Sequence, residues 1–406
     1  MDAAARRQIG LLNTGHAFTH FTMLVLPTAV LAMAGPDSPF GGDYASVLAL
    51  MTGLYVAYGL ATLPQGWIAG VIGRKSMLAV FFLGTAAMLA ATAAAQDRLW
   101  LALALTGTGL FVAFYHPIGI AMLIEAAGDK PGRALGINGL LGNGGSALAP
   151  IVTAFVTAQF GWRAAFALPA IFGALVGIAW LVHRIPSRHS QKAIQEFVPL
   201  PPHVERQATI LLMTMAGLIG FAVTSFTVLI PKLMEERLSG DSTLLPLLGA
   251  AAFVATACGA FSQYAVGRFM DRTTMRWVYL PLSAALLPAL AGLALFQGWI
   301  AVPLAAVVTA CLFGQGTITE TSAAQFIAPE RRAKLYSIRF FIAFAGSAIA
   351  APLVAGLHSA TGSLDAVMLV LILAAGLASA CAWAFPERED VTATGLARGG
   401  APTANA

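Results

Sequence analysis

Four ionisable side chains stand inside long apolar stretches of this sequence, where such groups are rare. Three are histidines: His16 and His20, four residues apart, and His116, which directly precedes a proline. The fourth is Glu320, in the second half of the chain. Histidine exchanges a proton near physiological pH, and glutamate can do so in a dry environment. These residue types favour proton exchange, binding of a small solute, or metal ligation.

The elements that carry these residues are apolar runs of about 20 residues or more. The chain has 406 residues, of which 58% are hydrophobic and 10% are charged, whereas about a quarter of the residues in soluble globular proteins are charged. Runs of this length can cross the hydrocarbon layer, and lipid leaves their backbone no partner except its own helix. The sequence therefore predicts an all-α membrane protein with spans at about 9–33, 44–70, 76–95, 99–126, 134–158, 164–183, 208–231, 245–266, 277–296, 300–327, 335–357 and 366–385.

The lysines and arginines predict the orientation of these twelve spans. Of the 23 basic residues, 18 fall on the side of the N-terminus and 4 on the other side, while Arg339 lies within a span. By the positive-inside rule, both termini and the central loop are expected in the cytoplasm, and the protein in the inner (plasma) membrane. The basic residues are spread over short turns rather than one patch, which argues against a nucleic-acid partner.

The two halves of the sequence repeat with an offset of 201 residues, which places Gly66 on Gly267 and Gly145 on Gly346. The predicted organisation is a six-helix half at 1–183, a cytoplasmic loop at 184–207, a second six-helix half at 208–385 and a disordered tail at 386–406. Such repeats are typical of transporters whose sites lie between the halves. The offset also brings His116 to within one helical turn of Glu320, so we expect the two to face each other across a cavity.

The titratable residues are predicted to lie near the middle of the membrane. At a rise of about 1.5 Å per helical residue, each of them lies roughly 14–20 Å along its helix from the nearest charged turn. The alternative to a functional site is a structural role. In that case the histidines are neutral and bonded to backbone, and a protonated glutamic acid fills a polar gap between helices. Because polar groups at this depth are costly and usually functional, we predict a site for proton coupling and substrate binding formed by His16, His20, His116, Glu320, Asn138 and Arg339.

The roles of two members of this set, Asn138 and Arg339, are less clear from the sequence. Asn138 lies in the predicted fifth span, and Arg339 lies five residues after Lys334 in the predicted eleventh. Arg339 could extend to the cytoplasmic surface, as long basic side chains do. Pro117 adds a local expectation, because it leaves the carbonyl group of Ala113 without a helical hydrogen bond and favours bending there.

The fifth span is rich in glycine. Gly136, Gly139, Gly142 and Gly145 recur at every third residue, and the run ends at Pro150. Small residues along one helix ridge let a neighbouring backbone come close, which is how helices associate in lipid. We expect close packing along this ridge.

The loop after the second span resembles a motif of the major facilitator superfamily, in which a glycine and an aspartate precede a glycine and two basic residues. This sequence has Gly70 in place of the aspartate, while the second copy keeps Asp271. The resemblance implies twelve helices in two pseudo-symmetric halves and a cytoplasmic gate in which Asp271 meets the start of the fifth span beside Arg133. The gating residues implied are Gly66, Gly73, Arg74, Lys75, Arg133, Gly267, Asp271 and Arg272.

Within that superfamily, two stretches resemble the fosmidomycin-resistance branch: His16 with Leu26-Pro27, and the segment 114–119 (FYHPIG). The glycine-rich span that ends at Pro150 is similar to drug/proton antiporters, although Ala149 stands where those exporters have glycine. The arginine that many of them carry in the fourth span has no counterpart here. The resemblance implies export of a small compound.

Three functions remain open. The first is proton-coupled export of a small organic solute or drug, and the second is proton-coupled import of a small organic anion or metabolite. The third is an intramembrane metalloenzyme with His16, His20 and His116 as ligands, which would leave the repeat unexplained. No nucleotide-binding loop is present in the sequence. We predict a monomeric transporter rather than an enzyme, with a small-molecule substrate, protons and the lipid bilayer as partners and no catalytic residue, cofactor or resident metal.

Overall fold

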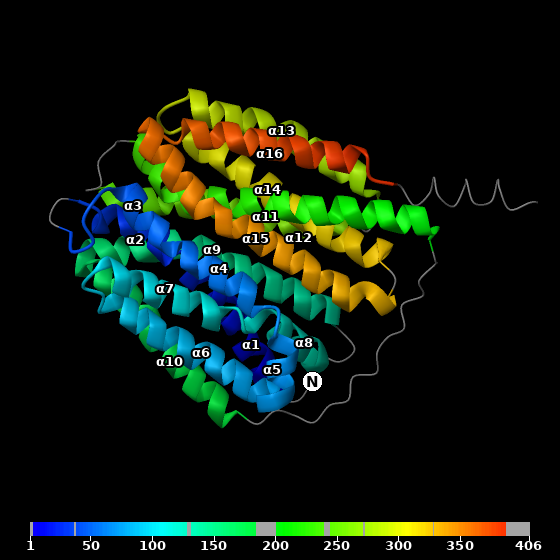
Figure 1. Ribbon diagram of the computed structural model, residues 1–406, viewed down its shortest axis with the longest axis horizontal. Helices are drawn as coiled ribbons and strands as arrows, with labels where there is room; N and C mark the ends of the chain where they lie inside the picture. Colours follow the sequence, from blue (N-terminus) through cyan, green and yellow to red (C-terminus); the bar gives the residue numbers. More distant parts are fainter. Residues whose placement is uncertain are drawn as a thin grey trace, which may run out of the picture.

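The computed structural model describes residues 3–35, 38–127, 131–183, 200–238, 244–270, 273–327 and 329–386, and all regular structure within them is helical (Figure 1). Within these residues, twelve helical stretches are long and apolar enough to cross a membrane, which confirms the predicted all-α fold. The predicted tail beyond 386, most of the central loop, and Asp271 with Arg272 lie outside the described residues.

The first half contains six candidate spans, several of them divided. Its elements are α1 Ala3–Met23, α2 Val25–Met33, α3 Tyr44–Leu48, η1 Ala49–Met51, α4 Thr52–Ala61, α5 Gln65–Ile72, α6 Arg74–Ala93, α7 Arg98–Val112, α8 Tyr115–Ala127, α9 Pro131–Phe160 and α10 Trp162–Val182.

Prolines explain two of these divisions. The predicted span at 44–70 ends earlier, because α4 stops at Ala61 and Pro64 stands at the cap of the separate helix α5. The predicted fourth span divides into α7 and α8 three to four residues before Pro117. Proline has no backbone N–H and clashes with the preceding turn, so each break falls on the N-terminal side of the ring. The helix is interrupted at Ala113 and Phe114, next to the carbonyl group at which bending is expected.

The second half contains the other six candidate spans, each a single helix. Its elements are α11 Pro202–Leu238, α12 Leu245–Met270, α13 Met275–Leu295, α14 Ala301–Phe326, α15 Pro329–Thr361 and α16 Asp365–Trp383.

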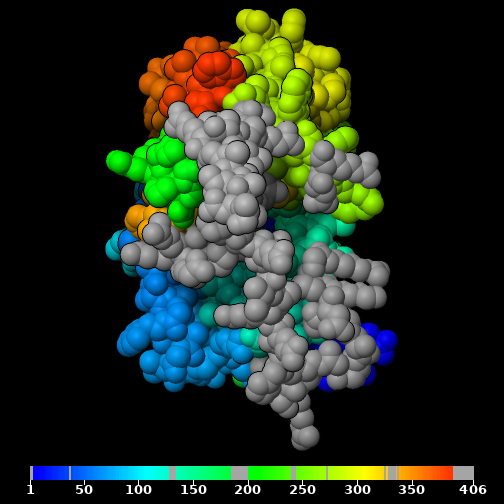
Figure 2. Space-filling model, turned by 90° about the vertical axis from the view of Figure 1, so that its right-hand side faces the viewer, coloured from blue at the N-terminus to red at the C-terminus, as the bar shows by residue number. Residues whose placement is uncertain are grey.

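The same helix pairs pack together in both halves. In the first half α1 packs on α9, α4 on α7, and α6 on α10. In the second half the equivalent pairs are α11 with α15, α12 with α14, and α13 with α16. Figure 2 views the end at which α1 begins and α16 ends, called here the terminal end, with blue elements of the first half below and yellow and red elements of the second half above.

The halves meet along two helix pairs, α9 with α12 and α4 with α15. A side-chain hydrogen bond from Asn143 to Gln263 links α9 to α12 within the membrane-spanning region. At the end opposite the termini, called here the distal end, α2 and α3 of the first half also pack against α11 and α15 of the second. The helices α9, α12, α4 and α15 therefore form the main contact between the halves.

Part of the glycine ridge on α9 produces the predicted close packing. A Cβ atom at Gly145 would lie 2.1 Å from the backbone oxygen of Ala17 on α1, and one at Gly142 would lie 2.6 Å from the ring of His16. Gly136 and Gly139 have no such neighbour within 4 Å, so the prediction is wrong for that part of the ridge, which lies nearer the terminal end. The repeat reproduces the contact, because a Cβ at Gly346 on α15 would lie 2.4 Å from a backbone oxygen of α11.

Replacing Gly145 by alanine should destabilise the protein by about 1–3 kcal/mol, since the methyl group must push α1 away from α9. The matched control is Gly144→Ala, where a Cβ has no atom within 4 Å and alanine should gain up to about 1 kcal/mol as a better helix former. Thermal unfolding of both purified variants in one detergent measures the difference. Equal midpoints for the two variants would contradict close α1–α9 packing.

Candidate functional site: a histidine cluster and an arginine–glutamate pair

The three histidines of the first half form one cluster. His16 and His20 project from the same face of α1, with ring centroids 4.9 Å apart, and His116 comes from α8 with its centroid 5.0 Å from His16 and 5.3 Å from His20. One ring nitrogen from each residue lies within 4.8 Å of the other two. The three histidines therefore converge on one place, whereas their role in proton coupling and their shared depth with Glu320 stay predictions.

The hydrogen bonds of His16 indicate its tautomer. Its Nδ1 lies 2.8 Å from the backbone oxygen of Asn138, and its Nε2 lies 3.2 Å from Nε2 of His20. A carbonyl oxygen can only accept, so Nδ1 of His16 carries the hydrogen and Nε2 of the neutral ring presents its lone pair. The lone pair of His16 therefore points toward His20 and the interior of the cluster.

Tyr58 on α4 connects the cluster to the second half. Its hydroxyl group lies 2.7 Å from Nδ1 of His116, and its ring lies 4.1 Å, centroid to centroid, from that of Phe344 on α15. Tyr58 is fully buried. A movement of α15 against α4 would therefore act directly on the partner of His116.

Asn138 is a structural partner of the histidines. Its side-chain amide donates to Oδ1 of Asn13 at 2.9 Å and to the hydroxyl oxygen of Tyr115 at 3.0 Å. The Tyr115 hydroxyl in turn donates to the backbone oxygen of Leu12 at 2.7 Å. These buried bonds connect α1, α8 and α9 next to the histidine rings. Asn138 therefore stabilises the helices that carry the cluster and does not face a cavity.

The second half carries a separate polar site on α14 and α15. Arg339 is buried, with 5% of its surface exposed, and donates to Oγ1 of Thr319 at 3.2 Å and to Oε1 of Glu320 at 3.4 Å. Burial excludes the alternative in which Arg339 extends to the membrane surface. The side chain of Glu320 is 56% exposed. The ion pair therefore joins a buried arginine to an exposed glutamate.

The residues of the gating motif that are described contact their own half. Arg74 at the start of α6 forms an ion pair with Glu125 of α8 at 2.6 Å, and Lys75 donates to the backbone oxygen of Leu181 at 2.8 Å. Gly73 has φ of +83° between α5 and α6, a conformation that favours glycine. A Cβ atom added at Gly66 or Gly267 would have no neighbour within 4 Å, and the side chain of Arg133 lies outside the described part of the chain.

At the distal end, residues of both halves contact each other. The ring of Tyr44 at the start of α3 lies 5.3 Å from Nζ of Lys232 on α11 and 5.3 Å, centroid to centroid, from His358 on α15. His358 bonds to Glu236 on α11 at 2.9 Å. The halves are therefore joined at this end by an aromatic and a cation–π contact of Tyr44, beside the His358–Glu236 bond within the second half.

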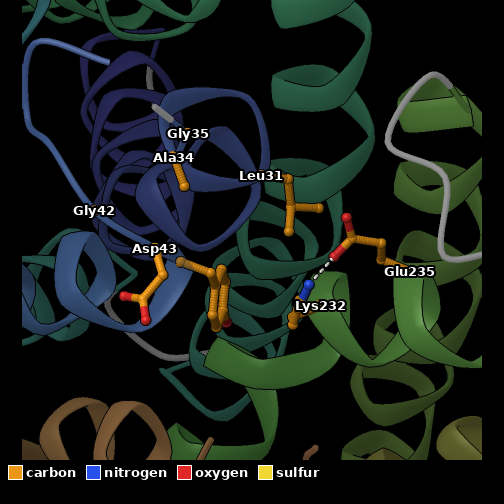
Figure 3. A pocket seen from close by; sticks show the side chains of 8 residues that line it. Leu31, Ala34, Gly35, Gly42, Asp43, Lys232 and Glu235 are labelled. Atoms are coloured by element: carbon orange, nitrogen blue, oxygen red, sulfur yellow. Dashed lines mark hydrogen bonds and ion pairs between the residues drawn. The ribbon is translucent and has the colours of Figure 1, made fainter. Parts of the chain in front are cut away.

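A cavity of about 480 Å³ opens beside these distal contacts. Figure 3 shows Asp43 and Lys232 on two of its sides, with Lys232 paired to Glu235. The backbone N–H of Ser46 donates to Asp43 at 2.8 Å and lowers the pKa of that carboxyl group below its usual value. The cavity thus has a carboxylate on the first half opposite an ion pair of the second.

The sequence matches the family described as Major Facilitator Superfamily over residues 15–327. The chain belongs to the major facilitator superfamily. Its family and fold are those of transporters, which are not enzymes, so the metalloenzyme alternative has no support. No curated protein sequence matches this chain.

Solved structures show the same fold at low sequence identity. A bacterial homologue of the human lysosomal transporter Spinster, inward-facing and occupied, has a TM-score of 0.72 at 14% identity, over 99% of this chain and 100% of that chain. The unoccupied inward-facing structure gives 0.68 at 15% identity over the same shares. The nucleoside transporter NupG gives 0.72 at 12% identity, over 94% of this chain and 100% of that chain.

Several residues around the site were not anticipated as partners of the histidines. Tyr58 and Asn13 are not among the site residues predicted from the sequence, and Tyr115 enters that prediction only as part of the segment 114–119. Gln65 was also missed: its side chain donates to the Ala113 carbonyl at 2.5 Å, the group that Pro117 leaves free. Buried amides and tyrosines in apolar spans are the signal that could have found them, because such groups need partners.

Asn138→Ala should destabilise the protein by about 1–3 kcal/mol, because it leaves the Asn13 carbonyl oxygen without its donor in a buried site. The control is Thr14→Ala on the same helix as Asn13, whose hydroxyl bonds only to Gly10 one turn away and whose loss should be close to neutral. Unfolding midpoints measured side by side give the comparison. A midpoint for Asn138→Ala within error of wild type would show that the network does not hold the cluster.

Proposed function

We propose that this chain is a proton-coupled secondary transporter that exports a small organic solute across the inner membrane, with both termini in the cytoplasm. The family supports transport, and the excess of basic residues on the terminal side supports the orientation. The organisation into two six-helix halves, supported by the equivalent helix pairs, provides the alternating access. In this proposal the distal end faces the periplasm, and its contacts between the halves correspond to a state closed on that side.

The observation that carries the proposal is the pair of Arg339 and Glu320. A buried guanidinium group in a membrane span is costly unless it is paired. Its partner carboxylate is more than half exposed. Exposing a charge within a span to lipid costs far more free energy than exposing it to a water-filled space between the halves. Glu320 is therefore accessible to protons while it is coupled to a buried cation.

The coupling follows from charge balance. When Glu320 takes up a proton, Arg339 loses its counter-charge and keeps only the hydroxyl of Thr319 among its polar partners given above. The unpaired cation then favours a rearrangement of α14 and α15, or an anionic group of the solute in place of the carboxylate. On the first half, His20 and His116 are partly exposed and provide the facing polar surface.

The finer assignment within the superfamily rests on two stretches of sequence. His16 and the segment 114–119 resemble the fosmidomycin-resistance branch, and the structure brings His16 and His116 into one cluster. We extend the proposal on this basis to small polar compounds as candidate solutes. The gate between Asp271 and Arg133 remains part of the same proposal.

A second function, proton-coupled import of an organic anion, is favoured by the burial of Arg339. A fixed cation beside the transport route would attract a carboxylate or phosphonate. The direction of accumulation separates the two functions: with an acidic lumen in inside-out vesicles, export predicts solute uptake and import predicts solute loss.

Glu320→Gln should abolish proton-driven accumulation while leaving solute exchange largely intact, because the amide keeps the shape but cannot carry the proton. The protein would be reconstituted in liposomes, and gradient-driven uptake and counterflow of the same labelled solute would be measured. Asp97→Asn is the matched control, since Asp97 caps α7 at the distal end and asparagine caps equally well. Accumulation by Glu320→Gln at the wild-type rate would remove Glu320 as the proton carrier.

A further inference from the structure

The histidine cluster has the geometry of a metal site. We propose that His16, His20 and His116 bind a divalent transition-metal ion of the zinc class in the transport cavity. Two histidines four residues apart on a helix supply ligands from one face, and a third from a neighbouring helix completes a facial set. The inference deepens the proposed transport function, because it assigns a class of ligand to the same cavity.

The distances suit a tetrahedral ion. With Zn–N bonds of about 2.0–2.1 Å, two nitrogens of a tetrahedral site lie about 3.3 Å apart. Nε2 of His16 and Nε2 of His20 are 3.2 Å apart. The ring nitrogen of His116 lies within 4.8 Å of both, so a movement of its ring by about an ångström or two closes the set.

The outer contacts of the rings are those that metal-ligating histidines make. Such a histidine donates its second ring N–H to a fixed oxygen, which orients the ring and directs the other nitrogen at the ion. His16 donates Nδ1–H to the backbone oxygen of Asn138 at 2.8 Å, and Nδ1 of His116 lies 2.7 Å from the hydroxyl of Tyr58. Two of the three ligands are therefore positioned from outside the cluster.

The cluster also has unused hydrogen-bonding capacity. Among the described residues, the bond to His16 is the one hydrogen bond made by His20, and the bond to Tyr58 is the one made by His116. The three imidazole rings lie in the membrane interior and have few other polar partners. Their free lone pairs are therefore available to bind a cation.

The donor set selects the kind of ion. Imidazole nitrogens suit zinc, copper, nickel and iron, whereas magnesium and calcium require oxygen ligands. Three neutral ligands leave the charge of the ion uncompensated and a fourth position open, unlike the closed four-ligand sites of structural zinc. His20 and His116 are partly exposed, so the open position of the proposed site lies on the exposed side of the cluster, where a small anion can complete the coordination.

Metal binding can be measured on the purified full chain carrying an affinity tag without histidine. We expect one Co²⁺ per chain with the visible absorption bands of four-coordinate cobalt, displaced by Zn²⁺. His20→Asn and His116→Asn should each weaken binding by at least about 100-fold, and Tyr58→Phe by roughly 10-fold through loss of the outer contact. His203→Asn, at an exposed histidine on α11, is the matched control and should bind as wild type does.

Two results would overturn the inference: no saturable binding of one ion per chain, or binding that persists unchanged in both His20→Asn and His116→Asn. Monodisperse elution and unfolding midpoints of the variants establish that they fold, and Tyr58→Phe tests the site without removing a ligand. Solute flux in proteoliposomes separates this inference from the proposed function. Gradient-driven transport without metal binding leaves the transport proposal standing, whereas metal binding without any flux leaves the metal site standing.

Discussion

Lipid offers no water, so a polar group buried within a span is costly unless it finds a partner in the protein. The break between α7 and α8 shows the consequence, because the Ala113 carbonyl freed by Pro117 is bonded by Gln65 from a neighbouring helix. The same constraint assembles the buried network of Asn13, Tyr115 and Asn138. Polar residues in this protein therefore fix which helices lie together, and they do so at the places where chemistry is expected.

Close helix packing brings these polar groups within reach of one another. Gly145 lets α9 approach the backbone of α1, and Gly142 leaves room for the ring of His16. The repeat keeps a glycine at the equivalent place, Gly346, while the polar residues have diverged, with Asn138 in one half and Arg339 in the other. One scaffold thus carries a histidine cluster in the first half and an arginine–glutamate pair in the second.

The sequence was sufficient for the fold because hydropathy and length alone determine which segments can span lipid. It also indicated the histidine cluster, since residues four apart on a helix share a face and the FYHPIG stretch marked the second helix. It could not decide between burial and surface extension for Arg339, because both are compatible with its distance from Lys334. The contacts of Tyr58 and Gln65 depend on the rotation of each helix against its neighbours, which periodicity leaves open in spans that are apolar on nearly every face.

Alternating access between the two halves is the central claim, and paired distance measurements test it most directly. Spin labels at Leu99 and Leu295, both exposed at the distal end and in different halves, would report opening there, and labels at Ile72 and Trp277 would report the terminal end. Under a change of pH with solute present, the distal distance should gain a longer component while the terminal distance gains a shorter one. Two distances that remain single and unchanged in every condition would contradict the account.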